Sequence, residues 1–306
     1  MLVHFGVDTL HAQWSDAVVC IGTFDGVHLG HRAVIAAAVK QASEAEIPGI
    51  VVTFDRHPAA TLAPERCPPS IASLEDSLRE MEGLGVALAV ALPFDRTLAD
   101  TSAEHFLEML RETLHASRLV IGHDFAFGRG REGNAEWLCA RMPTTVVPPF
   151  SLDGVRVSSS AIRQAVAEGR IEDAARLLGR PFAIDGIVVG GAKLGRTLGY
   201  PTLNLVRAIR QVTPADGIYA GWAETPIGGY LAAISIGFRP TVGGSQRTIE
   251  AYLLDYPGDS LYGKPVRLAF DRRLRDEVRF ESLEALKDQM ARDVAEVGAM
   301  ATSRRA

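Results

Sequence analysis

The sequence predicts a two-domain protein: an α/β domain built on a parallel sheet, followed by an antiparallel all-β domain that ends in a helix. Three observations predict this. The length of 306 residues is that of about two domains. The first half alternates apolar runs with amphipathic stretches, whereas strand-like runs follow one another directly after residue 182. We therefore expect domains at 1–182 and 183–306.

Four short runs in the first half are apolar at consecutive positions, which is typical of strands buried on both faces of a parallel sheet. They are AVVCIGTF (17–24), GIVVTF (49–54), VALAVAL (86–92) and SRLVIG (117–122). Between them, apolar residues recur at helical spacing over 31–46, 70–85 and 102–116. This alternation predicts a parallel sheet with helices on both sides, and a ligand beyond the carboxyl ends of its strands.

In the second half, Gly, Pro and Asp turns divide the chain into strand-like runs. The runs are FAIDGIVVGG (182–191), GIYAGWAE (217–224), GGYLAAISIG (228–237), TIEAYLLDY (248–256) and PVRLAFDRRLR (265–275). Because no helix-length pattern separates them, neighbouring strands are expected to pair antiparallel, in a barrel or a sandwich. A final helix is expected over 282–297, with Ser282 as its N-cap.

Composition and charge narrow the class of protein. The chain is 47% hydrophobic and 23% charged, as in soluble globular proteins, and its net charge of −5 favours neither nucleic acid nor an anionic membrane as partner. The first residues lack the pattern of a signal peptide, and VALAVALPF (86–94) is too short to cross a bilayer. Three widely spaced cysteines indicate reduced thiols. We expect a cytoplasmic monomer or weak homo-oligomer.

The segment GTFDGVHLGH (Gly22–His31) joins the first predicted strand to the first predicted helix. Gly26 and Gly30 allow backbone conformations and close approaches that side chains would prevent. His28 and His31 add imidazole donors where a helix beginning near His31 offers unpaired N–H groups. This combination favours a phosphate. Polar caps on a loop are one alternative, and a metal site, for which no third ligand is obvious nearby, is another.

A second polar segment, VSSSAIRQAVAEG (157–169), ends with a helical pattern. Its serines suit the N-cap of a helix, which alone explains them. Arg163 lies one turn further on, so hydroxyl, N–H and guanidinium groups would face one point, as a polyphosphate requires. Together with the histidine segment, it is similar to the adenylyl-transfer signature of the nucleotidyltransferase superfamily. In that chemistry a phosphate attacks the α-phosphorus of ATP and pyrophosphate leaves.

The second half carries a glycine-rich segment, GGAKLGRTLGYPTLN. Its opening GGAKLGRT has P-loop spacing, but Gly199 and Pro201 forbid the helix that a P-loop needs next. Thr202 and Asn204 are two apart on an expected strand, so their side chains share a face, and their oxygens suit Mg²⁺. The alternative is a turn followed by an ordinary strand.

Glu250 lies in the predicted strand TIEAYLLDY, where it alternates with Ile249, Ala251 and Leu253. Its side chain therefore faces away from theirs. Such a position suits a surface carboxylate and an active-site base equally.

Taken end to end, the chain resembles the bacterial bifunctional riboflavin kinase/FMN adenylyltransferases, or FAD synthetases. GTFDGVHLGH, TFDRHP, IGHDFAFGRGREG, VSSSAIR and LLGRPF resemble the adenylylating domain, and GRTLGYPTLN, GIYAG, IGFRPT, IEAYLLD, LYG and LRDEVRF the kinase domain. The resemblance implies that riboflavin and ATP give FMN and ADP, and that FMN and ATP then give FAD and pyrophosphate. It implies a Rossmann-like nucleotidyltransferase domain and a six-stranded antiparallel β-barrel with a terminal helix.

The same resemblance implies roles for individual residues, with His28 and His31 on the ATP phosphates of the adenylylating site. That site would comprise Gly22, Phe24, Asp25, Gly26, His28, Gly30, His31, Asp124, Ser159, Ser160 and Arg163. In the kinase site, Glu250 would take the proton of the ribityl 5′-hydroxyl, and Thr202 and Asn204 would hold Mg²⁺ with ATP. That site would comprise Gly195, Arg196, Gly199, Pro201, Thr202, Asn204 and Arg275.

Three positions depart from the family pattern. Thr23 stands where asparagine is common, Arg56 replaces a proline, and His123 stands where an acidic or small residue is typical. None of them removes a residue with an implied chemical role.

Two other classes of function are alternatives. One is a different small-molecule adenylyltransferase with an unrelated C-terminal domain, which the kinase motifs disfavour. The other is a non-enzymatic flavin-binding regulator, which the presence of His28, His31, Asn204 and Glu250 disfavours. A substrate screen tests the first alternative, and turnover of riboflavin with ATP and Mg²⁺ excludes the second.

Overall fold

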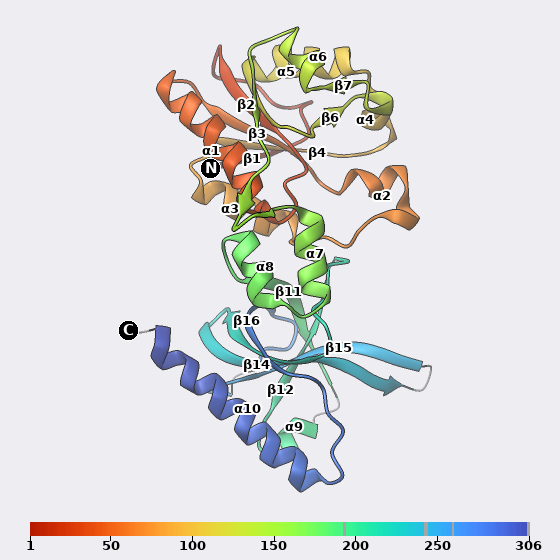
Figure 1. Ribbon diagram of the computed structural model, residues 1–306, viewed down its shortest axis with the longest axis vertical. Coiled ribbons are helices and arrows are strands. Elements are labelled where there is room, and N and C mark those ends of the chain that lie inside the picture. The colour runs from red at the N-terminus through yellow and green to blue at the C-terminus, as the bar shows by residue number, and fades with distance from the viewer. Residues whose placement is uncertain (192–193, 208, 242–243, 259, 305–306) are drawn as a thin grey trace. The chain divides into compact units, whose positions relative to one another are not determined.

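The computed structural model describes residues 1–191, 194–207, 209–241, 244–258 and 260–304. The side chains of residues 194, 196, 239–241, 244–246 and 301–304 lie outside this description. The chain forms two compact units, Met1–Ser159 and Ser160–Ala306, and Figure 1 labels their elements.

The first unit is built on a six-stranded sheet whose strands pair in parallel, as predicted. In spatial order the strands are β1 (Leu2–Phe5), β4 (Leu88–Leu92), β3 (Gly49–Phe54), β2 (Ala17–Ile21), β5 (Ala116–Gly122) and β8 (Thr144–Val147). The chain moves outwards from β2 through β3 and β4, then returns to the other side of β2 with β5. Open α/β sheets bind ligands at such a switch point, outside the carboxyl ends of the strands.

The three predicted helices of this unit are α1 (Leu29–Glu44), α3 (Leu74–Gly83) and α5 (Ala103–Leu114). The strands β1 and β8 were not predicted, because they are the two edges of the sheet and their residues are largely exposed rather than continuously apolar. Three short helices were also missed: α2 (Pro58–Leu62), α4 (Arg96–Asp100) and α6 (Ala135–Cys139). The smallest elements are η1 (Asp25–Val27), η2 (Pro64–Arg66), η3 (Arg129–Arg131), β6 (Ala126–Phe127), β7 (Gly133–Asn134), β9 (Ser151–Leu152) and β10 (Val155–Arg156).

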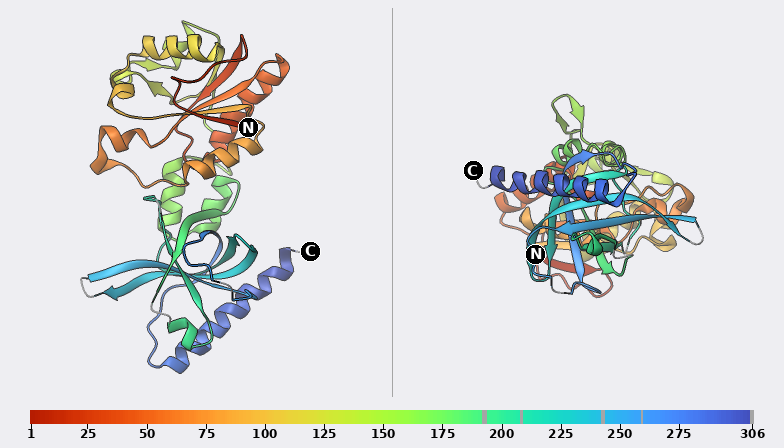
Figure 2. Two further views of the ribbon diagram at one scale, coloured as in Figure 1. Left: turned by 180° about the vertical axis from the view of Figure 1, so that it is seen from behind. Right: turned by 90° about the horizontal axis from the view of Figure 1, so that it is seen from below.

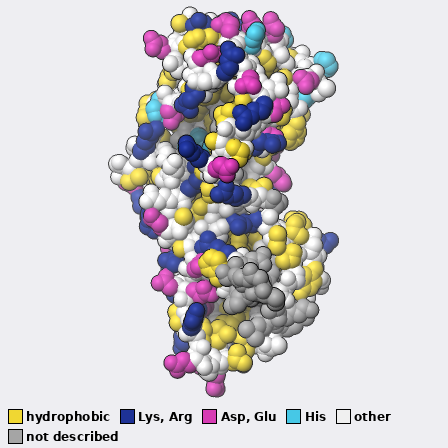
Figure 3. Space-filling view, turned by 90° about the vertical axis from the view of Figure 1, so that its right-hand side faces the viewer, with side chains coloured by type: hydrophobic (Ala, Val, Ile, Leu, Met, Phe, Trp, Pro, Cys, Tyr) yellow, Lys and Arg dark blue, Asp and Glu magenta, His cyan; other side chains and the backbone are white. Residues whose placement is uncertain are grey.

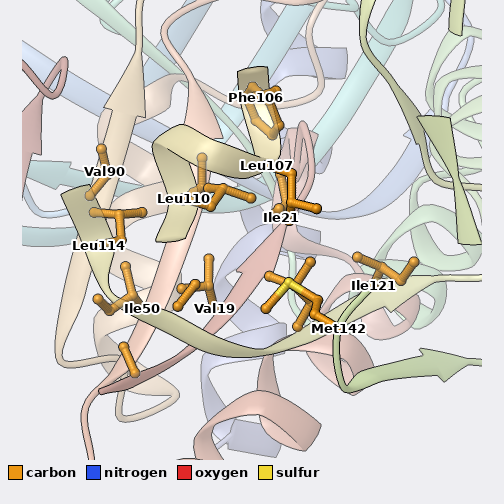
Figure 4. Packing of buried hydrophobic residues seen from close by; sticks show 14 of the residues in the cluster. Val19, Ile21, Ile50, Val90, Phe106, Leu107, Leu110, Leu114, Ile121 and Met142 are labelled. Atoms are coloured by element: carbon orange, nitrogen blue, oxygen red, sulfur yellow. The ribbon is translucent and has the colours of Figure 1, made fainter. Parts of the chain in front are cut away.

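Both faces of the central strand β2 are buried. Val19 and Ile21 pack with residues of α5 in the core that Figure 4 shows. Val18 and Cys20 face the other way and pack with residues of α1. Because alternate residues of a strand face opposite sides, a strand covered on both sides has to be apolar throughout. The same burial raises the pKa of the Cys20 thiol, which keeps it protonated and unreactive.

The second unit begins within α7 (Ser159–Ala167), continues with α8 (Ile171–Leu178), and then forms a closed six-stranded barrel. In spatial order its strands are β11 (Phe182–Val189), β12 (Thr202–Val206), β15 (Gly244–Leu253), β14 (Gly228–Thr241), β13 (Gly217–Thr225) and β16 (Pro265–Arg275). All paired strands are antiparallel, as predicted. Closure decides between the barrel and the sandwich, and it leaves no free sheet edge among these strands.

The terminal helix α10 (Leu283–Arg304) lies along β13 and β14, as Figures 1 and 2 show. Ser282 is its N-cap, as predicted, since the Ser282 hydroxyl accepts a hydrogen bond from the N–H of Ala285 at 3.1 Å. At the end of β16, Arg275 donates to both carboxylate oxygens of Asp293, at 2.9 and 2.6 Å, and Asp293 is buried. This bidentate pair ties the helix to the barrel.

The described helices include none that is both long and apolar enough to cross a membrane. Basic and acidic side chains are interspersed over the face seen in Figure 3. This mixture fits a chain with 32 basic and 37 acidic residues.

The compact units divide the chain earlier than the predicted domain boundary at residue 182. The helix α8 packs against β11 and β16 of the barrel, and its Ile171 and Leu178 are fully buried. The barrel therefore shares part of its packing with a helix that the sequence places in the first domain.

We expect a fragment of residues 160–306 to be more stable than a fragment of residues 183–306. The shorter fragment lacks α8, so it loses the burial of two large apolar side chains and exposes the surface of β11 and β16 that the helix covers, which together cost roughly 3–6 kcal/mol of unfolding free energy. Urea unfolding of both fragments, followed by circular dichroism, measures the difference. Equal midpoints would show that the barrel does not need α8.

Candidate functional site

The turn between β2 and α1 has an unusual backbone. Phe24, Gly26 and Val27 have φ angles of 47°, 76° and 39°, in the left-handed region. Side-chain-bearing residues adopt this region at a cost of about 1–2 kcal/mol each. Such turns persist only where the surroundings fix them, and they cluster at functional sites. The left-handed Phe24 also explains why β2 ends at Ile21, three residues before the predicted end of the strand.

The glycines of this turn accommodate the protein's own side chains. A Cβ atom on Gly22 would lie 2.9 Å from the Phe24 ring, and one on Gly26 would lie 2.6 Å from Ile71 Cγ2. A Cβ atom on Gly30 would lie 3.2 Å from the His28 ring. The close approaches expected from the sequence are therefore internal ones, which pack the turn tightly.

His28 is buried and is the N-cap of α1, which begins at Leu29, two residues earlier than predicted. Its Nδ1 accepts a hydrogen bond from the backbone N–H of His31 at 3.2 Å. An acceptor nitrogen carries no proton, so the neutral ring has its proton on Nε2. The cap therefore selects the tautomer and makes Nε2–H the donor of His28.

His31 stacks on His28, with ring centroids 3.5 Å apart and an interplanar angle of 16°. The edge of Phe24 meets the His31 ring at a centroid distance of 5.3 Å. Within the described part of the chain, no group of three His, Cys, Asp or Glu residues is arranged to hold a metal ion. The two histidines form a stacked pair at the start of a helix, which is a setting for an anion.

The Asp25 side chain ties the turn to the backbone at Ile71 and Ala72. Its Oδ1 accepts hydrogen bonds from the N–H groups of Ile71, at 2.9 Å, and Ala72, at 3.3 Å. This side chain, expected among the ATP-binding residues, acts in the structure as a positioning group for the turn. The neighbouring departure, Thr23, is anchored through its backbone, since its carbonyl accepts a hydrogen bond from the buried Thr53 hydroxyl at 3.2 Å.

The departure at Arg56 has a local explanation. Arg56 donates to both oxygens of Asp55, at 3.1 and 2.8 Å, and Asp55 also accepts from the N–H of Phe94 at 2.9 Å. Burial raises the pKa of Asp55, but these hydrogen bonds outweigh it and lower the pKa below its usual value. Arg56 thus neutralises a carboxylate at the end of β3.

His123 and Asp124 follow β5 at the same edge of the sheet. One guanidinium nitrogen of Arg156 lies 2.9 Å from His123 Nε2 and 3.4 Å from Asp124 Oδ2. Sequence reasoning missed Arg156, although it stands two residues before the serines of the second motif. The contact links the loop after β5 to the hairpin β9–β10 that leads into α7.

The second motif begins α7 at Ser159, as the cap interpretation predicts for this stretch. Ser160 is exposed and Arg163 is half-buried. The boundary between the compact units falls between Ser159 and Ser160. The expected meeting of Arg163 with the histidine turn stays a prediction.

In the barrel, the structure brings together Thr202, Asn204 and Glu250. Asn204 is the direct cross-strand partner of Glu250, and the Thr202 hydroxyl donates to Glu250 Oε2 at 3.1 Å. The alternate residues Leu205, Ile249 and Ala251 are buried in the core. Glu250 therefore faces away from the apolar residues of its strand, as predicted, on the outer face of the barrel wall.

The glycine-rich segment lies directly on this polar group. A Cβ atom on Gly191 would lie 2.2 Å from Asn204 Nδ2, and one on Gly195 would lie 2.3 Å from the Tyr200 carbonyl. The short helix α9 (Leu194–Thr197) ends within the segment, and β12 rather than a helix follows Pro201, so the segment is not a P-loop. Gly199 has a φ of 90° in open space, and the side chain of Arg196 lies outside the described residues.

Arg275 makes structural contacts in the barrel. The guanidinium donates to Asp293 on α10 and to the Asp276 carbonyl at 2.9 Å, and its expected place among the ligand-binding residues stays a prediction. These bonds give it a structural function at the base of the helix.

Comparison with known proteins covers both halves of the chain. The family model for FAD synthetase matches residues 10–161, and that for riboflavin kinase matches residues 178–301. Bifunctional riboflavin kinase/FMN adenylyltransferases are similar over most of their length. The protein of Escherichia coli K12 is 40% identical (92% of each chain), that of Haemophilus influenzae 37% (94% of this chain, 96% of the relative), and that of Bacillus subtilis 33% (93% and 92%).

A solved structure has the same overall architecture. It is described as a macrolide-efflux protein from Streptococcus pneumoniae and is 32% identical in sequence. The match has a TM-score of 0.88 and covers 96% of this chain and 98% of the other. Its description names an activity that the matching family models and the bifunctional relatives above do not share.

We expect Gly26→Ala to destabilise the protein more than Gly130→Ala does. Both glycines have a positive φ, 76° and 65°, so alanine is strained at each. Only at Gly26 does the new Cβ collide, with Ile71, because nothing lies within 4 Å at Gly130. Overpacking of this kind costs about 1–3 kcal/mol. Denaturant unfolding of the two variants measures the excess, and equal losses would contradict the tight packing of the turn.

Proposed function

This chain belongs to the family of bifunctional riboflavin kinase/FMN adenylyltransferases, and from that premise we propose which residues carry each of its two reactions. The enzyme phosphorylates riboflavin to FMN with ATP, and it adenylylates FMN to FAD with release of pyrophosphate. We assign the adenylyl transfer to residues 1–182 and the phosphorylation to residues 183–306. The observation that carries the assignment of the kinase site is the hydrogen bond from Thr202 to Glu250 beside Asn204.

In the adenylyl transfer, the FMN phosphate attacks the α-phosphorus of ATP, and negative charge grows on the phosphate oxygens as pyrophosphate leaves. The protein's task is to position the reactants and to stabilise this charge. His28 suits that task because its cap fixes Nε2–H as a donor while the ring is neutral. The N–H groups at the start of α1 add a positive potential at the same place. His31, stacked on His28, completes the pair of donors.

In the kinase reaction, Glu250 acts as the base that takes the proton of the ribityl 5′-hydroxyl. The hydroxyl of Thr202 orients the carboxylate before substrate binds, since it donates to one carboxylate oxygen. As the base, this carboxylate takes the proton of the substrate hydroxyl. A half-buried carboxylate on the wall of the barrel is sheltered from water on its core side and open to substrate on the other.

The donor set at Thr202, Asn204 and Glu250 fits Mg²⁺. Hydroxyl, amide and carboxylate oxygens are the hard ligands that this ion accepts, usually one or two from protein with phosphates and water supplying the rest. The Asn204 amide packs directly against Gly191, where a Cβ atom would lie 2.2 Å from Nδ2, so a side chain at position 191 would displace the amide. When bound, Mg²⁺ would neutralise charge on the ATP phosphates. Thr202 and Asn204 would hold it.

The partners we propose are small molecules: riboflavin, FMN and ATP. A net charge of −5 supports no role in binding nucleic acid or an anionic membrane surface. The three cysteines are free thiols, which fits the reducing cytoplasm. A monomer or weak homo-oligomer remains our expectation for the state of assembly.

Replacing the histidines should stop FAD formation and leave FMN formation intact. In His28→Asn the amide oxygen can still cap α1, but the imidazole donor is lost. We expect FAD production from supplied FMN to fall by about 10²–10³ in His28→Asn and further in the His28→Ala, His31→Ala double variant. Chromatography of both flavin products measures this. If His28→Asn keeps the wild-type rate, His28 serves the helix and not the reaction.

Glu250→Gln should have the opposite effect. The amide keeps the size of the side chain and its hydrogen bond with Thr202, but it cannot accept the hydroxyl proton. FMN formation should fall by roughly 10²–10⁴, while supplied FMN is still converted to FAD. Glu224→Gln, on the exposed face of β13, is the matched control and should leave both reactions unchanged. Loss of both reactions in Glu250→Gln would indicate misfolding, and loss of neither would make Glu250 a surface carboxylate.

A further inference from the structure

Two arginines lie level with each other at one end of the barrel. Thr202, Leu203 and Asn204 of β12 pair with Tyr252, Ala251 and Glu250 of β15. Continuing this antiparallel register past the end of β12 sets Arg207 opposite Arg247. Both have the strand parity of the core residues Leu205 and Ile249. Glu250 has the opposite parity; Arg207 is half-buried and Arg247 is exposed.

Side-chain contacts confirm that the two guanidinium groups are neighbours. Arg207 donates through Nη1 to the Gln211 carbonyl, at 2.7 Å, and to the Thr213 hydroxyl. Arg247 donates through Nη2 to the carbonyl of Pro214 at 2.5 Å. Thr213 and Pro214 are consecutive, so both arginines contact one short piece of the loop that precedes β13.

Two carboxylates at this end of the barrel are already paired with other arginines. Asp216 pairs with Arg247 at 2.6 Å. Asp276 pairs with Arg273 at 2.9 Å, while Arg273 also donates to the backbone carbonyl of Asp216 at 2.7 Å. Arg207 is half-buried. No carboxylate of the described residues lies within ion-pair distance of its guanidinium. Burial, and then the charge of Arg247, lower the pKa of the Arg207 guanidinium. Like charges directly opposite each other destabilise a sheet. Asp216 compensates the charge of Arg247 alone, so an anion beside Arg207 would relieve the remaining repulsion.

We propose that Arg207 and Arg247 form a binding site for a phosphate-class oxyanion at this end of the barrel, separate from the kinase site around Glu250. The hydrogen bonds that Arg207 makes to described residues use only Nη1. Its Nε–H and Nη2–H edge is the planar fork that binds two oxygens of a phosphate at once. Arg247 adds a second positive charge from the facing strand. The phosphate is either the free ion or the phosphate group of a monoester.

Calorimetric titration of the full-length protein with inorganic phosphate tests the site. Chloride is replaced at constant ionic strength, so that screening is equal throughout. Arg207→Gln should bind phosphate at this site at least about tenfold more weakly, the loss of a charge-assisted pair of hydrogen bonds. Arg272→Gln changes an exposed arginine of β16, a strand that pairs with neither β12 nor β15, and should titrate like the wild type. Identical isotherms for all three proteins would overturn the proposal.

Thermal unfolding separates an anion site from a merely structural arginine. Without phosphate, Arg207→Gln should unfold at or above the wild-type temperature, because it removes one of two facing positive charges. Phosphate should raise the unfolding temperature of the wild type and leave that of Arg207→Gln nearly unchanged. If Arg207→Gln is destabilised equally in both buffers, Arg207 only closes the loop before β13, and the proposal fails.

Competition identifies the source of the phosphate. FMN and riboflavin differ by the phosphate group alone, so each is titrated against the inorganic ion. Arg207-dependent competition by FMN and not by riboflavin assigns the site to a phosphate monoester. If neither FMN nor riboflavin competes while inorganic phosphate still binds, the site is assigned to the free ion. Both results support an oxyanion site, whereas competition by riboflavin equal to that by FMN would contradict it.

Discussion

The first unit depends on one hydrogen bond, from the backbone N–H of His31 to Nδ1 of His28. It begins α1 at Leu29, directly after a turn whose φ angles are held in the left-handed region by the packing of Phe24 and Ile71. It also fixes which nitrogen of His28 carries the proton. The start of α1, the stacking of the two imidazole rings and the direction of the His28 donor therefore all follow from this contact, which lies at the switch point of the parallel sheet.

In the barrel, the candidate catalytic residues lie on the strands of the wall, which must also supply the apolar core. Alternation along β12 and β15 sends Leu205, Ile249 and Ala251 into the core and leaves Asn204 and Glu250 outside. The glycine-rich segment approaches Asn204 so closely that Gly191 has no room for a side chain. A carboxylate gains shelter without entering the apolar interior, where its charged form would be costly.

Several charged residues of the motifs serve structure before chemistry. Asp25 caps the segment at Ile71, and Arg275 fixes α10 through Asp293. Both are also expected to touch ligand, which stays a prediction, and their hydrogen bonds set the positions of neighbouring elements. Motif membership alone does not separate the two kinds of role, because both require a precisely placed charge. Arg207 and Arg247 lie outside every motif of the sequence analysis, although both donate hydrogen bonds to the loop before β13.

The sequence alone determined both fold classes, because strands buried on two faces must be apolar throughout and strands of a barrel must alternate. It also determined that Thr202 and Asn204 share a face with period two, and it identified the turn at His28 through its glycines. Tertiary structure decided what depends on distant partners: the edge strands β1 and β8, closure of the barrel, and the tautomer of His28. It alone gave Arg156 its partners His123 and Asp124, since contacts between residues far apart in the chain leave no local pattern.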